Sequence, residues 1–172
     1  MLAALPLLLQ ISIRPLSVTP AQHERIALRV ANPSDTAVIA VRVEVPSVLT
    51  ILGLDAPPGW TARLDPATDT TAQAIVWSGG ALHRLEFREF AFLARPAADV
   101  KPLPLVFPVR LDRADGAVRL WGPGGIASAP TIAISTATGI TPGGAFGLGA
   151  AGIGIALFAL ILALRRPAAT PG

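Results

Sequence analysis

The stretch RIALRVANPSDTAVIAVRVEVP, residues 25–46, decides the fold class of this chain. Apolar side chains alternate with polar or small ones on both sides of a central turn, which is the pattern of half-buried β-strands. The residues predicted to point inward are Ile26, Leu28 and Val30 in the first strand and Ile39, Val41, Val43 and Val45 in the second. Residues 32–35 predict a turn, because proline fixes φ while Asn and Asp bond their own backbone. We therefore expect the two strands to form a hairpin.

The same alternation continues along the chain. It predicts further strands at 48–54, 60–64, 74–77, 85–93, 103–111 and 117–121, with a last short strand at 132–134. Turn-forming residues recur about every ten residues, and this spacing favours an all-β, immunoglobulin-like β-sandwich over a barrel.

Three local features refine this prediction. Residues 78–80 predict a turn, because Ser and two glycines follow each other. The apolar phase of 85–93 changes from Leu85 and Phe87 to Phe90 and Phe92, which predicts a bulge. Three prolines in 102–108 cannot donate to a ladder, so at least one side of the strand 103–111 should be a sheet edge.

Residues 145–164 (AFGLGAAGIGIALFALILAL) contain no charged side chain and are followed directly by Arg165 and Arg166. About 20 apolar residues suffice to cross the hydrocarbon layer as a helix. Arginines that flank a span stay on the cytoplasmic side, so the tail 165–172 should be inside and the main domain outside. Small residues at four-residue spacing, Gly143, Gly147 and Ala151, suggest a weak homodimer through this anchor. Residues 135–144 should form a linker.

The N-terminal residues 1–13 are also hydrophobic, over the length of a signal-peptide h-region and too short to span a membrane. The favoured interpretation is a leader. Because a cationic region and a clear cleavage site are lacking, an uncleaved segment and a buried first strand are the alternatives. The remaining length suits a single domain.

Composition excludes several function classes. The calculated pI is near 11.0, but the net charge is only +3 and the arginines are scattered. Without a basic stripe or a reader motif, nucleic-acid binding is not expected. The chain has no cysteine, which excludes disulfides, thiolate metal sites and thiol catalysis. A G-x-S-x-G elbow and a phosphate-binding loop are also missing, so we expect no enzymatic activity.

The remaining chemical candidates are few. His23 and His83 are expected to be solvated loop residues, since two histidines alone make a poor metal site. Glu86 and Glu89 most simply belong to a charged strand face. Trp60 and Trp77 are expected to pack in the core, whereas Trp121 has a second interpretation that rests on family resemblance.

Several segments, taken in order, resemble the YcnI-like copper-binding family. They are VTPA at 18–21, LRVAN at 28–32, VEVP at 43–46, PPGW at 57–60, VWSGG at 76–80, FREFAF at 87–92 and DGAVRLW at 115–121. The resemblance covers residues 15–134, and the anchor that ends in basic residues fits the same architecture. It implies an extracytoplasmic β-sandwich on a bacterial cell membrane, associated with copper handling.

The resemblance also implies a metal site. In that family an N-terminal histidine, a carboxylate and a tryptophan hold copper. Trp121 matches the tryptophan and Asp65 is the first candidate for the carboxylate, but the expected histidine position falls near Arg14 or Pro15. Imidazole is the natural ligand for Cu(II), so a carboxylate and an indole alone would bind it weakly.

Two functions remain open at this point. The first is copper handling through a modified site, with a copper-handling partner protein supplying ligands. The second is a metal-free immunoglobulin-like module that binds an envelope protein or another partner.

Overall fold

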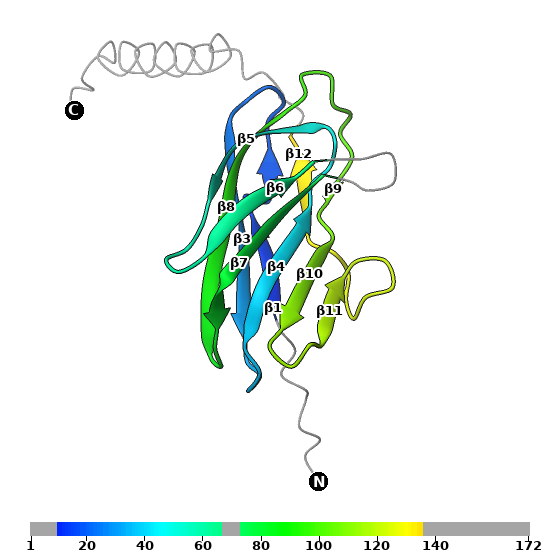
Figure 1. Ribbon diagram of the computed structural model, residues 1–172. Coiled ribbons are helices and arrows are strands. Elements are labelled where there is room, and N and C mark those ends of the chain that lie inside the picture. Colours follow the sequence, from blue (N-terminus) through cyan, green and yellow to red (C-terminus); the bar gives the residue numbers. More distant parts are fainter. Residues whose placement is uncertain (1–9, 67–72, 136–172) are drawn as a thin grey trace, which may run out of the picture. The chain divides into compact units, whose positions relative to one another are not determined.

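The computed structural model of the protein describes residues 10–66 and 73–135. Two β-sheets form the two layers of a sandwich (Figure 1). The four-stranded sheet has the order β1 (Gln10–Arg14), β3 (Glu24–Asn32), β8 (Glu86–Pro96), β5 (Leu49–Asp55). The five-stranded sheet has the order β11 (Val118–Trp121), β10 (Val109–Arg113), β4 (Val38–Glu44), β7 (Ala74–Leu82), β6 (Thr61–Asp65). A small third sheet has the order β2 (Ser17–Val18), β12 (Thr131–Ile134), β9 (Leu105–Val106).

The core lies between the two larger sheets and follows the period-two pattern. On β3 the predicted inward residues Ile26, Leu28 and Val30 are all fully buried. Two indoles close the core, because the rings of Trp60 and Trp77 both pack against Phe90, with centroid distances of 5.0 and 5.5 Å. The predicted packing role of both tryptophans is therefore confirmed.

The predicted hairpin of residues 25–45 is wrong. β3 pairs with β1 and β8, whereas β4 pairs with β10 and β7 in the other sheet. The turn after Asn32 thus carries the chain from one sheet to the other. Two strands with apolar inner faces satisfy the same alternation pattern whether they pair within a sheet or face each other across a core.

Ile39 was also assigned to the wrong face. Its side chain is 41% exposed, while Val38 and Val41 are fully buried. The pairing of β4 with β10 changes register where Asp112 and Arg113 lie opposite Ala40 and Val38, so one extra residue, Ile39, stands in β4. A bulge of this kind turns the inserted side chain away from the face that its neighbours share.

The bulge predicted for 85–93 is not found. β8 runs beside β3 without a register shift, and Phe87 simply lies on the outer face. There the Arg29 guanidinium sits 5.3 Å from the centre of the Phe87 ring. Leu85 precedes the strand in a turn, with φ of 61° and high exposure. The change of apolar phase therefore comes from exposed apolar residues and not from an irregular strand.

Two predicted boundaries also change. β7 continues from Ala74 to Leu82 through the glycines that predicted a turn, although its register against β4 shifts between Ser78 and Leu82. Gly80 lies in that strand because the Trp60 ring occupies the place of a side chain: a Cβ there would be 2.3 Å from Nε1 of Trp60. The strand predicted at 103–111 is split into β9 and β10. β9 lies at the edge of the small sheet, as the prolines on either side of it predicted.

The N-terminal stretch is a strand from Gln10 onward. β1 pairs with β3 from Gln10 opposite Ala31 to Arg14 opposite Ala27, and Ile13 is buried. Residues 10–13 of the predicted leader thus form a strand of the sandwich, as in the alternative of a first strand, and a leader of residues 1–13 stays a prediction. Residues 1–9 lie outside the described part of the chain.

The predicted anchor 145–164, its linker after residue 135 and the tail 165–172 also lie outside the described residues. Within residues 10–66 and 73–135 there is no helix long and apolar enough to cross a membrane.

Candidate functional site

Trp121 ends β11 at one edge of the five-stranded sheet, and its side chain is only 5% exposed. It lies opposite Val109 of β10 and forms an isolated bridge with Ala127, after the loop 122–126 turns back. The indole thus closes the core at this edge. It also borders two cavities. One, of about 380 Å³, is lined by Glu44 with Arg42 and Arg110, and the larger one, shared with β1, gives Trp121 a second role to consider.

The cavity beside Trp121 has a volume of about 510 Å³. Strand β1 contributes Gln10, Ile11 and Ser12 to its wall, and the loop after β11 contributes the stretch from Ile126 to Ser128. Arg14 and Pro15, where the family resemblance expects a histidine, are not among its lining residues. Among the described residues, β1 therefore reaches the Trp121 cavity through Gln10, Ile11 and Ser12, which precede the predicted position.

The residues around this cavity do not fit a copper ion. Its polar lining residues are Gln10, Ser12, Arg29 and Ser128, and the guanidinium of Arg29 is paired with Glu89 of β8. Among the described residues that line it there is no imidazole or carboxylate, and Cu(II) requires such ligands. A guanidinium is always protonated and repels a cation.

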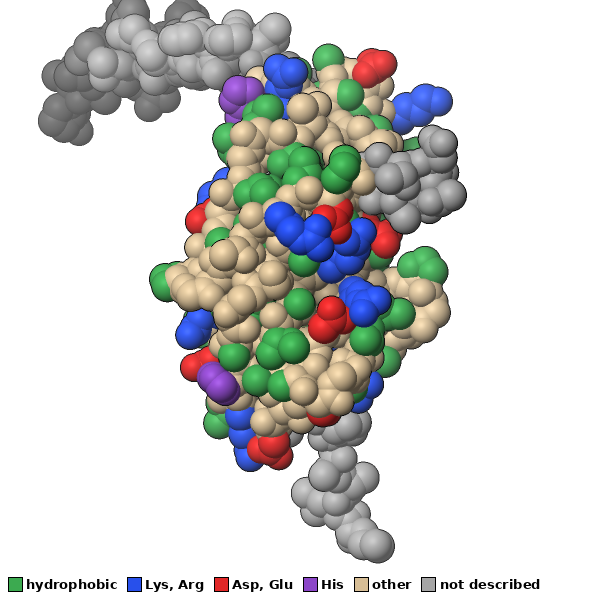
Figure 2. Space-filling view, viewed as in Figure 1, with side chains coloured by type: hydrophobic (Ala, Val, Ile, Leu, Met, Phe, Trp, Pro, Cys, Tyr) green, Lys and Arg blue, Asp and Glu red, His purple; other side chains and the backbone are tan. Residues whose placement is uncertain are grey.

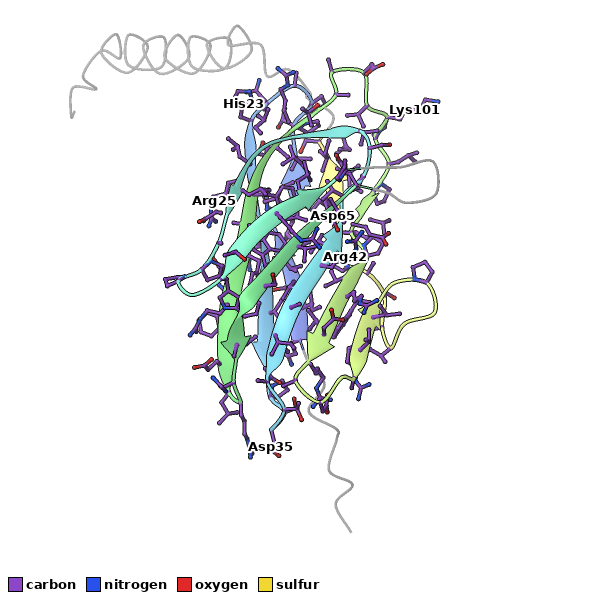
Figure 3. The ribbon with its side chains drawn as sticks, viewed as in Figure 1. His23, Arg25, Asp35, Arg42, Asp65 and Lys101 are labelled. Carbon is purple, nitrogen blue, oxygen red and sulfur yellow. The ribbon has the colours of Figure 1, made fainter. Side chains whose placement is uncertain are left out.

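Asp65, the second predicted site residue, lies at the end of β6 on the outer face of the five-stranded sheet (Figure 3). Its carboxylate accepts hydrogen bonds from two guanidiniums, those of Arg42, at 2.5 Å, and Arg63. A metal ion at Asp65 would have to displace both arginines. The local geometry therefore gives Asp65 a role in pairing charges between strands.

The structure does not bring Trp121 and Asp65 together. β11 and β6 are the two opposite edges of the five-stranded sheet. Four strand spacings separate them, or roughly 19 Å at about 4.8 Å per spacing. Within residues 10–66 and 73–135, no group of three or more His, Asp or Glu side chains is placed to hold a metal ion.

The outer face of the five-stranded sheet is highly charged but internally paired. Arg42 lies opposite Arg110 of β10 on one side and Val76 of β7 on the other, and Arg110 donates to Asp112 at 2.8 Å. Figure 2 shows the result as interspersed blue and red side chains on this face. Exposed ion pairs of this kind contribute little stability each, and their alternating sign does not form a basic stripe.

A larger groove lies at one end of the sandwich and has a volume of about 1140 Å³. We call it the end groove. Its walls come from the first residues of β5, from Leu64 of β6, from β9 and from the loops 44–48 and 97–104. Leu64, Leu103 and Val106 are 43%, 64% and 46% exposed there, so apolar side chains face solvent along it. Among the described residues, the charged ones in its lining are Glu44, Asp99 and Lys101.

The two histidines lie in solvent-exposed turns, as predicted. His23 comes just before β3, and His83 follows β7. Neither lines the end groove or the cavity beside Trp121.

Comparison with known protein families matches residues 11–129 to the family described as "Domain of unknown function (DUF1775)". The chain belongs to this family. The match begins inside β1, which agrees with a domain that starts before residue 15. No curated protein matches the DUF1775 chain.

Solved structures resemble the DUF1775 domain in fold. A Nocardia farcinica protein described as having an immunoglobulin-like fold is 22% identical, with a TM-score of 0.58 over 73% of this chain and 98% of that one. A cohesin module of a Clostridium perfringens family 33 glycoside hydrolase is 10% identical, with a TM-score of 0.53 over 74% and 96%. A non-cellulosomal cohesin from Archaeoglobus fulgidus is 12% identical, with a TM-score of 0.50 over 76% and 93%. At these identities the likeness establishes the immunoglobulin-like fold alone.

Sequence reasoning missed both Gln10 and the end groove. Gln10 was hidden by the leader interpretation, although the alternation of Ile11, Ser12 and Ile13 was a signal for a strand. The groove is assembled from three strand edges and two loops, and no local sequence pattern predicts such a surface.

Proposed function

We propose that this DUF1775 protein is a non-catalytic binding domain of the YcnI-like type, held on the outer face of the cell membrane by residues 145–164. Its ligand is an extended, largely apolar segment of another envelope protein. The observation that carries the proposal is the end groove, where apolar side chains remain exposed beside free strand edges.

Free strand edges make the end groove suitable for a peptide. β5, β6 and β9 each lie at the edge of their sheet, so among the described residues no strand pairs with one side of each. All three line the groove. An extended peptide that adds to such an edge gains backbone hydrogen bonds, while side-chain pockets give it specificity.

The size and charge of the groove narrow the ligand class further. Small-molecule pockets measure roughly 300–1,000 Å³, and the end groove, at about 1140 Å³, exceeds this range. Two carboxylates, Glu44 and Asp99, and one ammonium group, Lys101, line it. The net negative charge favours a segment that carries a Lys or Arg beside its apolar residues.

Copper handling is the second candidate function. It is supported by the YcnI-like resemblance and by the position of Trp121 beside a cavity that also contacts the N-terminal strand. The donor set of that cavity argues against it, and for this reason we place it second.

Crosslinking in cells tests the proposed binding function. A photoreactive amino acid replaces Leu103 in the end groove or, as a control, Leu120, which is 40% exposed on β11 at the other edge of the sheet. We expect a specific crosslink only from position 103. The captured segment is then identified by mass spectrometry and titrated as a synthetic peptide against the full-length protein.

The titration uses two matched variants. Leu64→Asp places a charge in the groove and should weaken binding of the synthetic peptide by more than about tenfold, or about 1.4 kcal/mol. Leu120→Asp should leave the affinity unchanged. Equal crosslinking from both positions, or an affinity that Leu64→Asp does not alter, would overturn the proposal.

A further inference from the structure

We infer that the cavity beside Trp121 is a metal-free site in this chain, and that Gln10 is the residue that makes it so. The inference concerns a different surface from the end groove and stands independently of the proposed function. It follows from which residues β1 brings to the cavity.

The pairing of β1 with β3 places Gln10 at the wall of the cavity. Gln10 pairs with Ala31 and Ser12 pairs with Arg29, and all four residues line the cavity with Trp121. Beyond Ser12 the strand leaves the cavity, since neither Ile13 nor Arg14 lines it. Among the described residues of β1, a metal ligand would therefore have to stand at position 10, 11 or 12, where only Gln10 and Ser12 carry a polar side chain.

The side chains present there have the wrong chemistry for a transition metal. The glutamine amide is neutral and is a much poorer ligand for Cu(II) than imidazole. Arg29 adds a positive charge, and it is held in place by Glu89, with 2.9 Å between Nη2 and Oε1, and by the ring of Phe87. The carboxylate of Glu89 on the neighbouring strand β8 is thus already bound to a guanidinium.

The histidines cannot substitute for residue 10. His23 precedes β3 by one residue, while the cavity lies near Ala31 at the other end of that strand. Eight residues of strand at about 3.3 Å each separate the two, or roughly 26 Å. His83 lies in the turn before β8 and does not line the cavity.

The test is a Cu(II) titration of the full-length protein in detergent, followed by tryptophan fluorescence and by electron paramagnetic resonance. All proteins carry His23→Asn and His83→Asn, which removes the two exposed imidazoles. Gln10→His is compared with Arg14→His, which places the same imidazole on the same strand but outside the cavity. Mass spectrometry defines the N-terminus, and thermal melting confirms that each variant folds.

We expect weak, unsaturated quenching for the parent protein and for Arg14→His. Gln10→His should bind Cu(II) more tightly than both by more than about tenfold, and its resonance spectrum should show nitrogen ligation. Tight binding of one Cu(II) by the parent protein would overturn the inference. So would an equal gain from Arg14→His, or no gain from Gln10→His.

Discussion

The contact between Gly80 and Trp60 shows how one residue without a side chain determines packing. A Cβ at Gly80 would lie 2.3–2.5 Å from three atoms of the Trp60 ring. That ring is 7% exposed and meets the edge of Phe90 on the opposite sheet. The indole therefore has no free space into which it can retreat.

Gly80→Ala should destabilise the domain by about 1–3 kcal/mol, the usual cost of overpacking. The measurement is the free energy of unfolding in urea, followed by tryptophan fluorescence. Gly53→Ala is the matched control, because Gly53 also lies in a strand and its Cβ would be 3.9 Å from the nearest atom. A Gly80→Ala variant as stable as Gly53→Ala would show that the Trp60 ring moves aside at no cost.

At the scale of elements, Asn32 explains why the chain changes sheets between β3 and β4. Asn32 is fully buried, and its amide nitrogen donates to the carbonyls of Thr36 and Leu82, each at 2.9 Å. Its carbonyl oxygen accepts from the backbone N–H and the hydroxyl of Ser34, at 3.0 and 2.6 Å. One side chain thus joins the end of β3, the turn that follows it and the end of β7.

Asn32→Ala should lower the free energy of unfolding by about 2–4 kcal/mol, because it leaves buried carbonyl groups without a donor. Ser34→Ala keeps both donations from Asn32 and should cost less than about 1.5 kcal/mol. Chemical denaturation of both variants measures the difference. Equal losses would mean that the turn, and not the bonds of Asn32 to Thr36 and Leu82, supplies the stability.

The strands themselves were largely predictable, whereas their pairing was not. Alternation located β3, β4, β5, β6, β8, β11 and β12 to within a few residues, because inward side chains of a sandwich repeat every two residues. The alternation could not distinguish a hairpin from a crossover at Asn32, because both arrangements bury the same faces of β3 and β4. The glycines of β7 were misread as a turn, because the ring that explains Gly80 belongs to Trp60, which lies just before β6 and twenty residues earlier in the sequence.

The candidate sites were less predictable than the fold. Family resemblance pointed to Trp121, but only the pairing of β1 with β3 shows that Gln10 and Ser12 line the cavity beside it. Asp65 looked like a free carboxylate in the sequence, and its two arginine partners come from residue 42, in another strand, and residue 63. Contacts between strands that are distant in sequence determine the chemistry in each case.

For the complete chain, we place the sandwich on the outer side of the cell membrane. Both candidate functions depend on this location, since an envelope segment and extracytoplasmic copper are met only outside the cytoplasm. The apolar segment 145–164 and the two arginines that follow it are the basis for this orientation.

The most direct test of the central claim, an outward-facing domain tethered at its C-terminal end, is a topology measurement on the full-length protein. A reporter fused after Gly172 should be cytoplasmic, and one fused at Gly139 should be exported, because positively charged flanks remain inside. Added protease should digest the sandwich in intact spheroplasts. Protection of the sandwich from protease there, or a cytoplasmic reporter at Gly139, would contradict the account.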